Sequence, residues 1–316
     1  MAALRKILSM LPFAASAPIG GQAVLEGVMM RSPSAWSVAV RKPDGQIAEV
    51  NRPVVAFSMR HKWARIPVIR GIVALGESLT IGFRALAISA NYAAQDDDEE
   101  VQTELTRGQL IFAFGVAIGF AVLLFKVSPA LITNLLPIEG NYSFVIVEGL
   151  IRVSLFIVYL LVISMLPDLK RVFQYHAAEH KAINALEAGD ELEPETVQKH
   201  SLIHVRCGTA FLLYVMVIAI FVFAFFGRLD WQWLIVTRIL LLPVIAGLAY
   251  EVIRFAGKHP QNVFLRTLLA PGLWLQRLTT REPSLDQIEV SIRALREVLR
   301  IEGRMTPEER KVEVMA

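Results

Sequence analysis

Two histidines four residues apart are the first residues in this sequence that could do chemistry. They lie in the stretch FQYHAAEHKAIN, residues 173–184, as His176 and His180, with Glu179 directly before the second. In a helix, residues four apart share a face, so the two imidazoles would stand one above the other. The order H-x-x-E-H is the inverse of the zincin motif, in which two imidazoles hold zinc and the glutamate activates a bound water. The alternative is an ordinary helix whose polar side chains face water, and the motif alone does not decide between the two.

A second group of metal-binding residue types follows in KHSLIHVRCGT, residues 199–209. His200, His204 and Cys207 are spaced four and three residues apart, which predicts that they share one face of a helix. Four of the six histidines and the single cysteine therefore fall between positions 176 and 207. A first-row transition metal with imidazole and thiolate ligands is a natural occupant of such a group. Each residue also has a simpler interpretation, since His200 could be an exposed polar residue and Cys207 a buried packing thiol.

The composition indicates where these residues would be placed. Of 316 residues, 54% are hydrophobic and 19% are charged, whereas soluble domains carry about 25% charged residues. The chain is therefore predicted to be a membrane protein. A formal net charge of only +3 gives little support for nucleic-acid binding, and one cysteine excludes a disulfide within one chain. The N-terminal stretch resembles a signal peptide only weakly, because its apolar part is short.

Four apolar segments are long enough to cross a bilayer, which takes about 20 helical residues. They are approximately 108–126, 143–166, 208–226 and 231–250. The loop 127–142 contains no lysine or arginine, whereas the loop 167–207 contains Lys170, Arg171, Lys181, Lys199 and Arg206. The positive-inside rule therefore predicts that this histidine-rich loop and both termini are cytoplasmic.

Charged residues inside these spans need partners, because each costs about 2.5–3.5 kcal/mol at a helix centre on insertion scales. Glu148 and Arg152 are four residues apart and could neutralise each other. Arg238 has no partner nearby in the sequence, which points to an acid from another helix, such as Glu148 or Glu77. Glu251 lies near the predicted depth of the histidines, and inverse zincins recruit a later glutamate as third ligand.

The region before the first span is predicted to contain a β-hairpin at roughly 36–56, because apolar residues alternate around the turn sequence PDG. It follows a glycine-rich stretch at 18–33 that carries Glu26 and Arg31. Residues 66–94 are apolar but place Arg70, Glu77 and Arg84 seven apart, on one helical stripe. This helix would lie in the interface or pack its stripe against protein, with a fifth span as the alternative. Residues 95–107 would be an acidic linker.

The C-terminal region, 256–316, is predicted to hold two cytoplasmic or interfacial helices. The first, at 263–278, is interrupted by Pro271-Gly272 and looks interfacial or re-entrant. The second, at 284–303, begins at Ser284 as its cap and repeats apolar residues every three or four positions, which is typical of an amphipathic helix. The last dozen residues would be frayed.

Five motifs together resemble those of the YqhQ-like family of bacterial integral membrane proteins, and the resemblance spans nearly the whole chain. The motifs are GGQAVLEGVMMR at 20–31, FQYHAAEHK at 173–181, HVRCGT at 204–209, YE at 250–251 and PGLWLQRLTTREP at 271–283. The resemblance implies a set of functional polar positions: Gln22, Glu26, Arg31, His176, Glu179, His180, Lys181, His204, Arg206, Cys207 and Glu251. His200 departs from the pattern and is a weaker ligand candidate.

We therefore expect a mainly α, polytopic inner-membrane protein with about four transmembrane helices, an N-terminal cytoplasmic β-hairpin region and amphipathic interfacial helices. The expected site binds a divalent transition metal, zinc before manganese or iron, and hydrolyses a membrane-proximal peptide or lipid-linked substrate. The residues divide by expected role: ligands His176, His180 and His204 with Glu251 or Cys207; catalytic Glu179, Lys181 and Arg206; substrate-binding Gln22, Glu26 and Arg31. Membrane lipids are expected partners, and the protein could be a homo-oligomer. A transporter and a scaffold with a structural metal are the alternatives, and the glycine-rich segment could instead be a lid.

Overall fold

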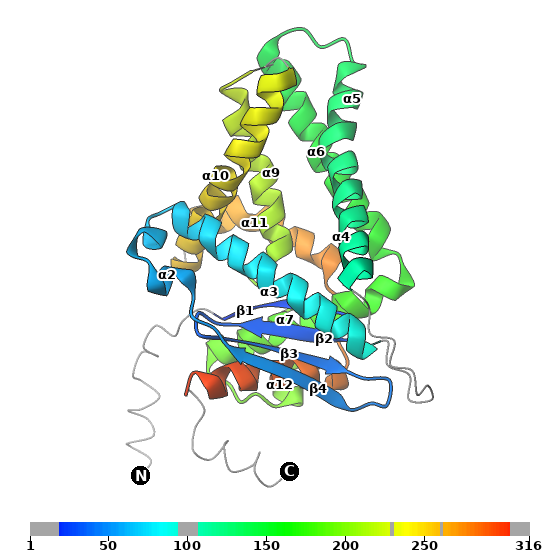
Figure 1. The fold of residues 1–316 in the computed structure, drawn as a ribbon, viewed down its shortest axis with the longest axis vertical. Helices are drawn as coiled ribbons and strands as arrows, with labels where there is room; N and C mark the ends of the chain where they lie inside the picture. The colour runs from blue at the N-terminus through cyan, green and yellow to red at the C-terminus, as the bar shows by residue number, and fades with distance from the viewer. Residues whose placement is uncertain (1–18, 94–106, 228–230, 260–261, 304–316) are drawn as a thin grey trace.

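The computed structural model describes residues 19–93, 107–227, 231–259 and 262–303, and it has a small sheet with flanking helices at one end and a helical bundle at the other (Figure 1). The signal-like N-terminus, the acidic stretch at 95–100 and the charged C-terminal end lie outside the described residues.

The sheet has four antiparallel strands in the order β1-β2-β3-β4. They are β1 (Gly20–Val24), β2 (Gly27–Arg31), β3 (Ala35–Arg41) and β4 (Ile47–Pro53). Strands β3 and β4 confirm the predicted hairpin, and Gly45 of the PDG turn has a φ of +84°, which glycine adopts without strain. The glycine-rich segment forms the other two strands and is part of the sheet, not a separate lid.

Helices cover both faces of this sheet. On one face, Met30 and Ala39 pack against α7 (Pro167–Ala188) and α12 (Leu285–Ile301). On the other face, Trp36 and Val38 pack against α3 (Ile69–Ala93). The strand residues alternate between these faces because successive side chains of a strand point to opposite sides. Helix α12 begins with the predicted Ser284 cap, which forms a capping box with Gln287.

Two of the three charged residues on the predicted stripe of α3 pair with other elements, and the third, Arg84, is exposed. Arg70 pairs with Glu251 of α10 (Trp231–Lys258), and Glu77 pairs with Arg31 of β2. The helix crosses the sheet obliquely beneath the bundle (Figure 1), with the short α2 (Phe57–Arg60) and a 3-10 turn, η1 (Lys62–Arg65), before it.

Four helical segments among the described residues are long and apolar enough to cross a membrane: Ile69–Ala93, Ile111–Asn134, Asn141–Ser164 and Val236–Ala256. The second is continuous through α4 (Arg107–Val122), a π-helical turn η2 (Leu123–Val127) and α5 (Ser128–Asn134), so half of the predicted loop 127–142 is helix. The third is α6 (Asn141–Ser164). The predicted span at 208–226 is the shorter apolar helix α9 (Gly208–Ala224).

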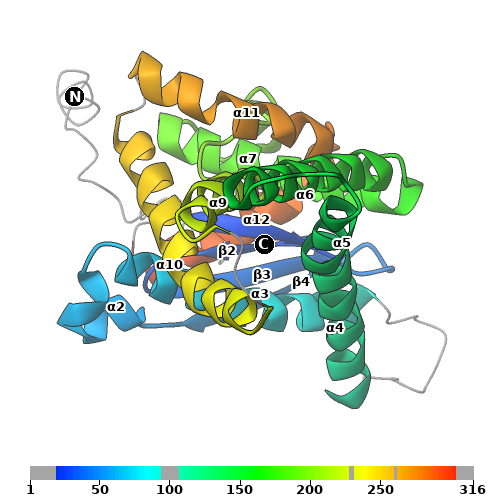
Figure 2. The ribbon, with the colours of Figure 1, turned by 90° about the horizontal axis from the view of Figure 1, so that it is seen from above.

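The bundle is completed by α11 (Val263–Thr279), and the short α8 (Pro194–Val197) follows α7. Helix α11 continues through Pro271, whereas the sequence predicted an interruption there. Next to this proline, a Cβ at Gly272 would lie 2.1 Å from the Tyr214 hydroxyl, so the glycine lets the continuous α11 pack directly against α9. Seen from above, α6, α9, α10 and α11 lie over the sheet and its α7–α12 layer (Figure 2).

Candidate metal centre

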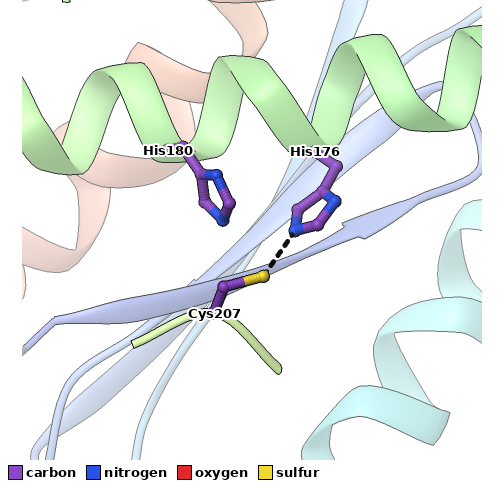
Figure 3. Close-up of side chains that lie close together, drawn as sticks. All are labelled: His176, His180 and Cys207. Atoms are coloured by element: carbon purple, nitrogen blue, oxygen red, sulfur yellow. Dashed lines mark hydrogen bonds between the residues drawn. The ribbon is translucent and has the colours of Figure 1, made fainter. Parts of the chain in front are cut away.

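Three side chains that bind transition metals converge between α7 and the start of α9. His176 and His180 project from adjacent turns of α7, and Cys207 is the residue directly before α9 (Figure 3). Their potential ligand atoms all lie within 4.8 Å of one another, and Cys207 Sγ is 3.3 Å from His176 Nε2. The predicted helical spacing of the two histidines is confirmed, and the third member of the group comes from a different element.

Backbone carbonyls fix the tautomer of both histidines. His176 Nδ1 lies 2.8 Å from the carbonyl oxygen of Thr279, and His180 Nδ1 lies 2.6 Å from that of Leu202. Since a carbonyl only accepts, each Nδ1 carries a proton, and in the neutral ring Nε2 is then the nitrogen with the lone pair. Metal-binding histidines are usually held in this way.

The Nε2 atom of His180 is buried and has no hydrogen-bond partner among the described residues. A buried nitrogen left without a partner costs about 1–3 kcal/mol, so such an atom calls for a ligand. Because this lone pair lies beside the Cys207 sulfur and the second imidazole, the donor set fits a transition metal.

Cys207 and His176 influence each other's protonation, because Cys207 Sγ lies 3.3 Å from His176 Nε2. Burial alone would raise the pKa of the Cys207 thiol, but the adjacent His176 and His180 hold it well below its usual value. Burial alone would likewise lower the pKa of His176, but the charge and hydrogen bond of Cys207 raise it to about 9. The pair therefore favours a thiolate, which is the form of cysteine that binds metals and acts as a nucleophile.

Glu179 lies beside this group, as the motif predicted. It is buried, and its Oε2 is 3.8 Å from His180 Nε2. Its side chain lies directly against the backbone of β1: a Cβ on Gly21 would come within 2.6 Å of Glu179 Cγ and 2.8 Å of the Met29 carbonyl oxygen. The glycine of GGQ therefore makes room for the carboxylate.

Lys181 holds the loop that orients His180. Its buried ammonium group donates to the carbonyl oxygens of Gln198 at 2.5 Å and His200 at 2.9 Å, and pairs with Glu282 at 3.0 Å. These contacts give Lys181 a positioning role. The two carbonyl groups accept from Lys181, whereas in an α-helix they would accept from backbone N–H groups four residues further on.

The stretch 199–207 is consequently not helical, and the predicted shared helical face of His200, His204 and Cys207 is wrong. The amide of Asn184 also donates to the carbonyl oxygens of Ser201 and Ile203 in this loop. The loop thus follows the surface of α7 in an irregular conformation, and only its last residue, Cys207, joins the converging group.

His204 and Arg206 form a separate ionic group around Glu187. His204 Nε2 is 3.4 Å from the Glu187 carboxylate, Arg206 pairs with the same carboxylate, and the His204 ring lies 5.9 Å from that of His180. Burial opposes ionisation of Glu187, but the hydrogen bond from His204 and the charge of Arg206 lower its pKa to about 2. The structure therefore does not place His204 among the ligand atoms.

Glu251 does not join the centre either. It accepts hydrogen bonds from the Arg70 guanidinium and from the backbone N–H of Val68 at 3.2 Å. His200, the weaker ligand candidate, also lies outside the centre, because its Nε2 is 3.1 Å from Oδ2 of Asp190. The sequence predicted that Glu251 lies at about the same depth relative to the membrane as the histidines, but it carried no information on which helix the side chain would face.

The three residues expected to contact substrate all have partners within the chain. Glu26 binds Arg171 at the β1–β2 turn, and Arg31 donates to Ser78 at 2.7 Å besides pairing with Glu77. The Gln22 amide lies against Gly82 of α3, where a Cβ would come within 2.4 Å of its oxygen. These contacts join the sheet to α3 and α7. The carbonyl groups of Leu202 and Thr279, which orient the histidines, gave no signal in the sequence.

Comparison with known proteins places the chain in a family. The family model described as "Protein of unknown function (DUF1385)" matches residues 66–301. The chain belongs to the DUF1385 family. It is also 35% identical over 296 residues to "Uncharacterized protein YqhQ" of Bacillus subtilis (strain 168), which covers 90% of this chain and 93% of that protein. The resemblance to YqhQ-like proteins is therefore confirmed. No solved structure matches the chain.

The DUF1385 match includes all three converging residues and both carbonyl groups that orient the histidines, since these lie between positions 176 and 279. Strands β1–β4 precede the matched range, although the similarity to the Bacillus protein covers most of the chain. The helices α7 and α9 that carry the centre are thus part of the family's shared region.

Proposed function

We propose that this protein is a multi-pass protein of the bacterial cytoplasmic membrane with a metal-dependent hydrolase site at its cytoplasmic face. The contrast between the lysine- and arginine-rich segment 167–207 and the uncharged-to-acidic segment 127–142 supports a cytoplasmic position for α7 and for both termini. Four apolar helices of spanning length support the membrane assignment.

One observation carries the metal assignment: one potential ligand atom from each of His176, His180 and Cys207 lies within 4.8 Å of the other two, while both Nδ1 atoms are bound to carbonyls. Three protein ligands with one open position are typical of catalytic zinc. Mixed imidazole and thiolate ligands favour zinc over manganese, with iron as the other candidate. A bound zinc would polarise the scissile bond and lower the pKa of a water molecule.

The remaining chemistry falls to side chains of this chain. The Glu179 carboxylate, next to His180, would take a proton from the attacking water and pass it to the leaving group. The carbonyl groups of Thr279 and Leu202 would hold the imidazoles in place during this transfer. Since α9 begins at the centre and runs into the bundle, the substrate would be a peptide or a lipid-linked ester or phosphate close to the membrane.

Metal analysis of the purified full-length protein tests this proposal. We expect about one zinc per chain by mass spectrometry, lost in His176→Ala, His180→Ala and Cys207→Ser. Glu179→Gln should retain the metal and fail to complement cells lacking the protein. His204→Ala serves as a matched control and should keep the metal. Folded protein that binds no transition metal even after zinc addition would refute the proposal.

A second candidate function is a thiol hydrolase, and the 3.3 Å contact between Cys207 Sγ and His176 Nε2 favours it. The third partner, the Thr279 carbonyl, orients the imidazole, which matches the general nucleophile–base–orienter arrangement. His180→Ala separates the two functions, because it removes a metal ligand and leaves the Cys207–His176 pair intact. Complementation that survives in His180→Ala but not in Cys207→Ser would favour the thiol enzyme.

A further inference from the structure

A second cluster of charged side chains lies inside the helical bundle, on elements that do not contribute to the metal centre. It comprises Glu148 and Arg152 of α6, Arg238 of α10 and Lys126 of the π-helical turn η2. Each lies between seven and eleven residues from the helix end remote from the sheet, which corresponds to about 10–17 Å along a helix. In Figure 1 these ends form the top of the bundle.

The single carboxylate of this cluster is shared by two guanidinium groups. Glu148 Oε1 accepts from Arg152 Nη2 at 2.5 Å, and Glu148 Oε2 accepts from Arg238 Nη2. Glu148 and Arg152 are almost completely buried, at 1% and 4% exposure. The predicted pairing within α6 is thus confirmed, and so is the predicted interhelical acid for Arg238.

Arg152 also reaches the π-helical turn. Its Nε donates to the carbonyl oxygen of Phe125 at 3.0 Å, which fixes the guanidinium beside the next residue, Lys126. Insertions of a π-helical turn into an α-helix occur frequently at functional sites. Here the turn brings a third cation towards the pair of arginines, because Lys126 directly follows the residue whose carbonyl Arg152 binds.

The charges of this cluster do not balance. Three cations and one carboxylate leave a net charge of +2, and Lys126 has no ion pair with any carboxylate of the described residues. Charged side chains inside a membrane are normally paired or serve a ligand, because hydrocarbon offers no compensation. A purely structural role explains two guanidinium groups on one glutamate, but it does not explain the third cation.

We propose that Lys126, Arg152 and Arg238 bind a phosphate-bearing anion in the half of the membrane remote from the sheet. The hydrogen bonds to Glu148 and Phe125 use Nη2 of both arginines and Nε of Arg152, so further N–H groups of both guanidinium groups remain for a ligand. Guanidinium groups match phosphate oxygens in geometry, and Lys126 adds a point charge. The ligand is the headgroup phosphate of a phospholipid or a free phosphate.

The proposal is tested with purified full-length protein in detergent, titrated with phosphatidylglycerol, phosphatidylcholine and inorganic phosphate. Binding is followed by native mass spectrometry for the lipids and by ³¹P NMR for phosphate. We expect phosphatidylglycerol to bind at least 10-fold more tightly than phosphatidylcholine if the ligand is an anionic lipid. Tighter binding of inorganic phosphate would instead identify a free anion.

Lys126→Gln should weaken binding at least 10-fold, and Lys126→Arg should preserve it. These variants leave the Glu148 pairs intact, so the protein should still fold, which size-exclusion chromatography and thermal unfolding can verify. Lys170→Gln, at an exposed position on α7, is the matched control. The proposal would be overturned if neither phosphatidylglycerol nor inorganic phosphate bound more tightly than phosphatidylcholine. It would also be overturned if folded Lys126→Gln bound these probes as tightly as wild type. Neither result depends on the metal centre, because no metal is measured.

Discussion

At the scale of single residues, the candidate site depends on small steric and electrostatic details next to the ligands. Gly20 and Gly21 are neighbours in β1, yet a Cβ on Gly20 would meet nothing within 4 Å, whereas one on Gly21 would collide with Glu179. Glu187, outside the ligand set, is ionised far below its usual range because His204 and Arg206 surround it.

Gly21→Ala should displace the Glu179 carboxylate while leaving the three ligand atoms in place. We expect zinc content to remain near wild type and complementation to fall at least 10-fold, with a loss of about 1–3 kcal/mol in stability from overpacking. Gly20→Ala is the matched control and should behave like wild type. Unchanged complementation by a stable Gly21→Ala protein would show that Glu179 needs no defined position.

Glu187 predicts a pH dependence of stability. Its pKa is about 2 in the folded protein and about 4.5 in the unfolded chain, so its stabilising effect is complete above pH 4.5 and disappears as the pH falls towards 2. The effect should be small, because 43% of the side chain is exposed and solvent screens the pair. Thermal unfolding should show Glu187→Gln less stable than wild type at pH 7, with the difference shrinking below pH 4.5. Glu191→Gln, at an exposed position, should show no such convergence.

At the scale of elements, the centre is an arrangement of one helix, one loop and the start of another helix. Helix α7 provides both histidines, and its Lys181 and Asn184 bind the carbonyl groups of the loop that follows α8. The loop in turn offers the Leu202 carbonyl to His180 and ends in Cys207. The geometry of the three candidate ligands therefore depends on how firmly this loop is held.

Lys181→Met should loosen the loop without removing a ligand. Loss of partners that orient metal ligands typically lowers metal affinity 10–100-fold, and we expect an effect of about that size. Zinc affinity measured by competition with a chelator would detect it. Lys199→Met, an exposed substitution in the same loop, should leave the affinity unchanged. Equal affinities for the two variants would exclude a positioning role for Lys181.

At the scale of the whole molecule, the chain forms a sheet covered by helices on both faces and an apolar bundle that contacts this layer through α3 and α7. Buried ion pairs stabilise the bundle, since Glu148 of α6 pairs with Arg152 of the same helix and with Arg238 of α10. The ion pair between Arg70 and Glu251 ties α3 to α10 in the same way. Removing a shared acid should therefore affect the assembly of several helices.

Glu148→Gln should destabilise the bundle strongly, because it leaves two guanidinium groups buried without a counter-charge. Breaking a buried pair by removing one partner costs about 3–5 kcal/mol, and thermal unfolding in detergent should report a large decrease in the midpoint. Glu139→Gln, in the loop before α6, is a control that should not change it. A midpoint equal to that of wild type would mean that water or lipid compensates the arginines.

The sequence by itself determined what local periodicity and composition control. It determined the spacing of His176 and His180 on one helix, the hairpin at the PDG turn, the apolar helices and the Ser284 cap, because each depends on residues within a few positions of one another. The ion pair between Glu148 and Arg152 belongs to the same class, since its members are four residues apart.

Only the tertiary structure decided which residue completes the histidine pair. The sequence favoured His204 as a ligand with Glu251 or Cys207 completing the set, and helical spacing favoured the wrong arrangement for 199–207. The outcome depended on contacts between residues far apart in the chain: Lys181 with the loop, Gln276 with His204, and Arg70 with Glu251. Such contacts are set by how helices and strands pack, and packing energies depend on all elements together, so no local pattern in the sequence records them.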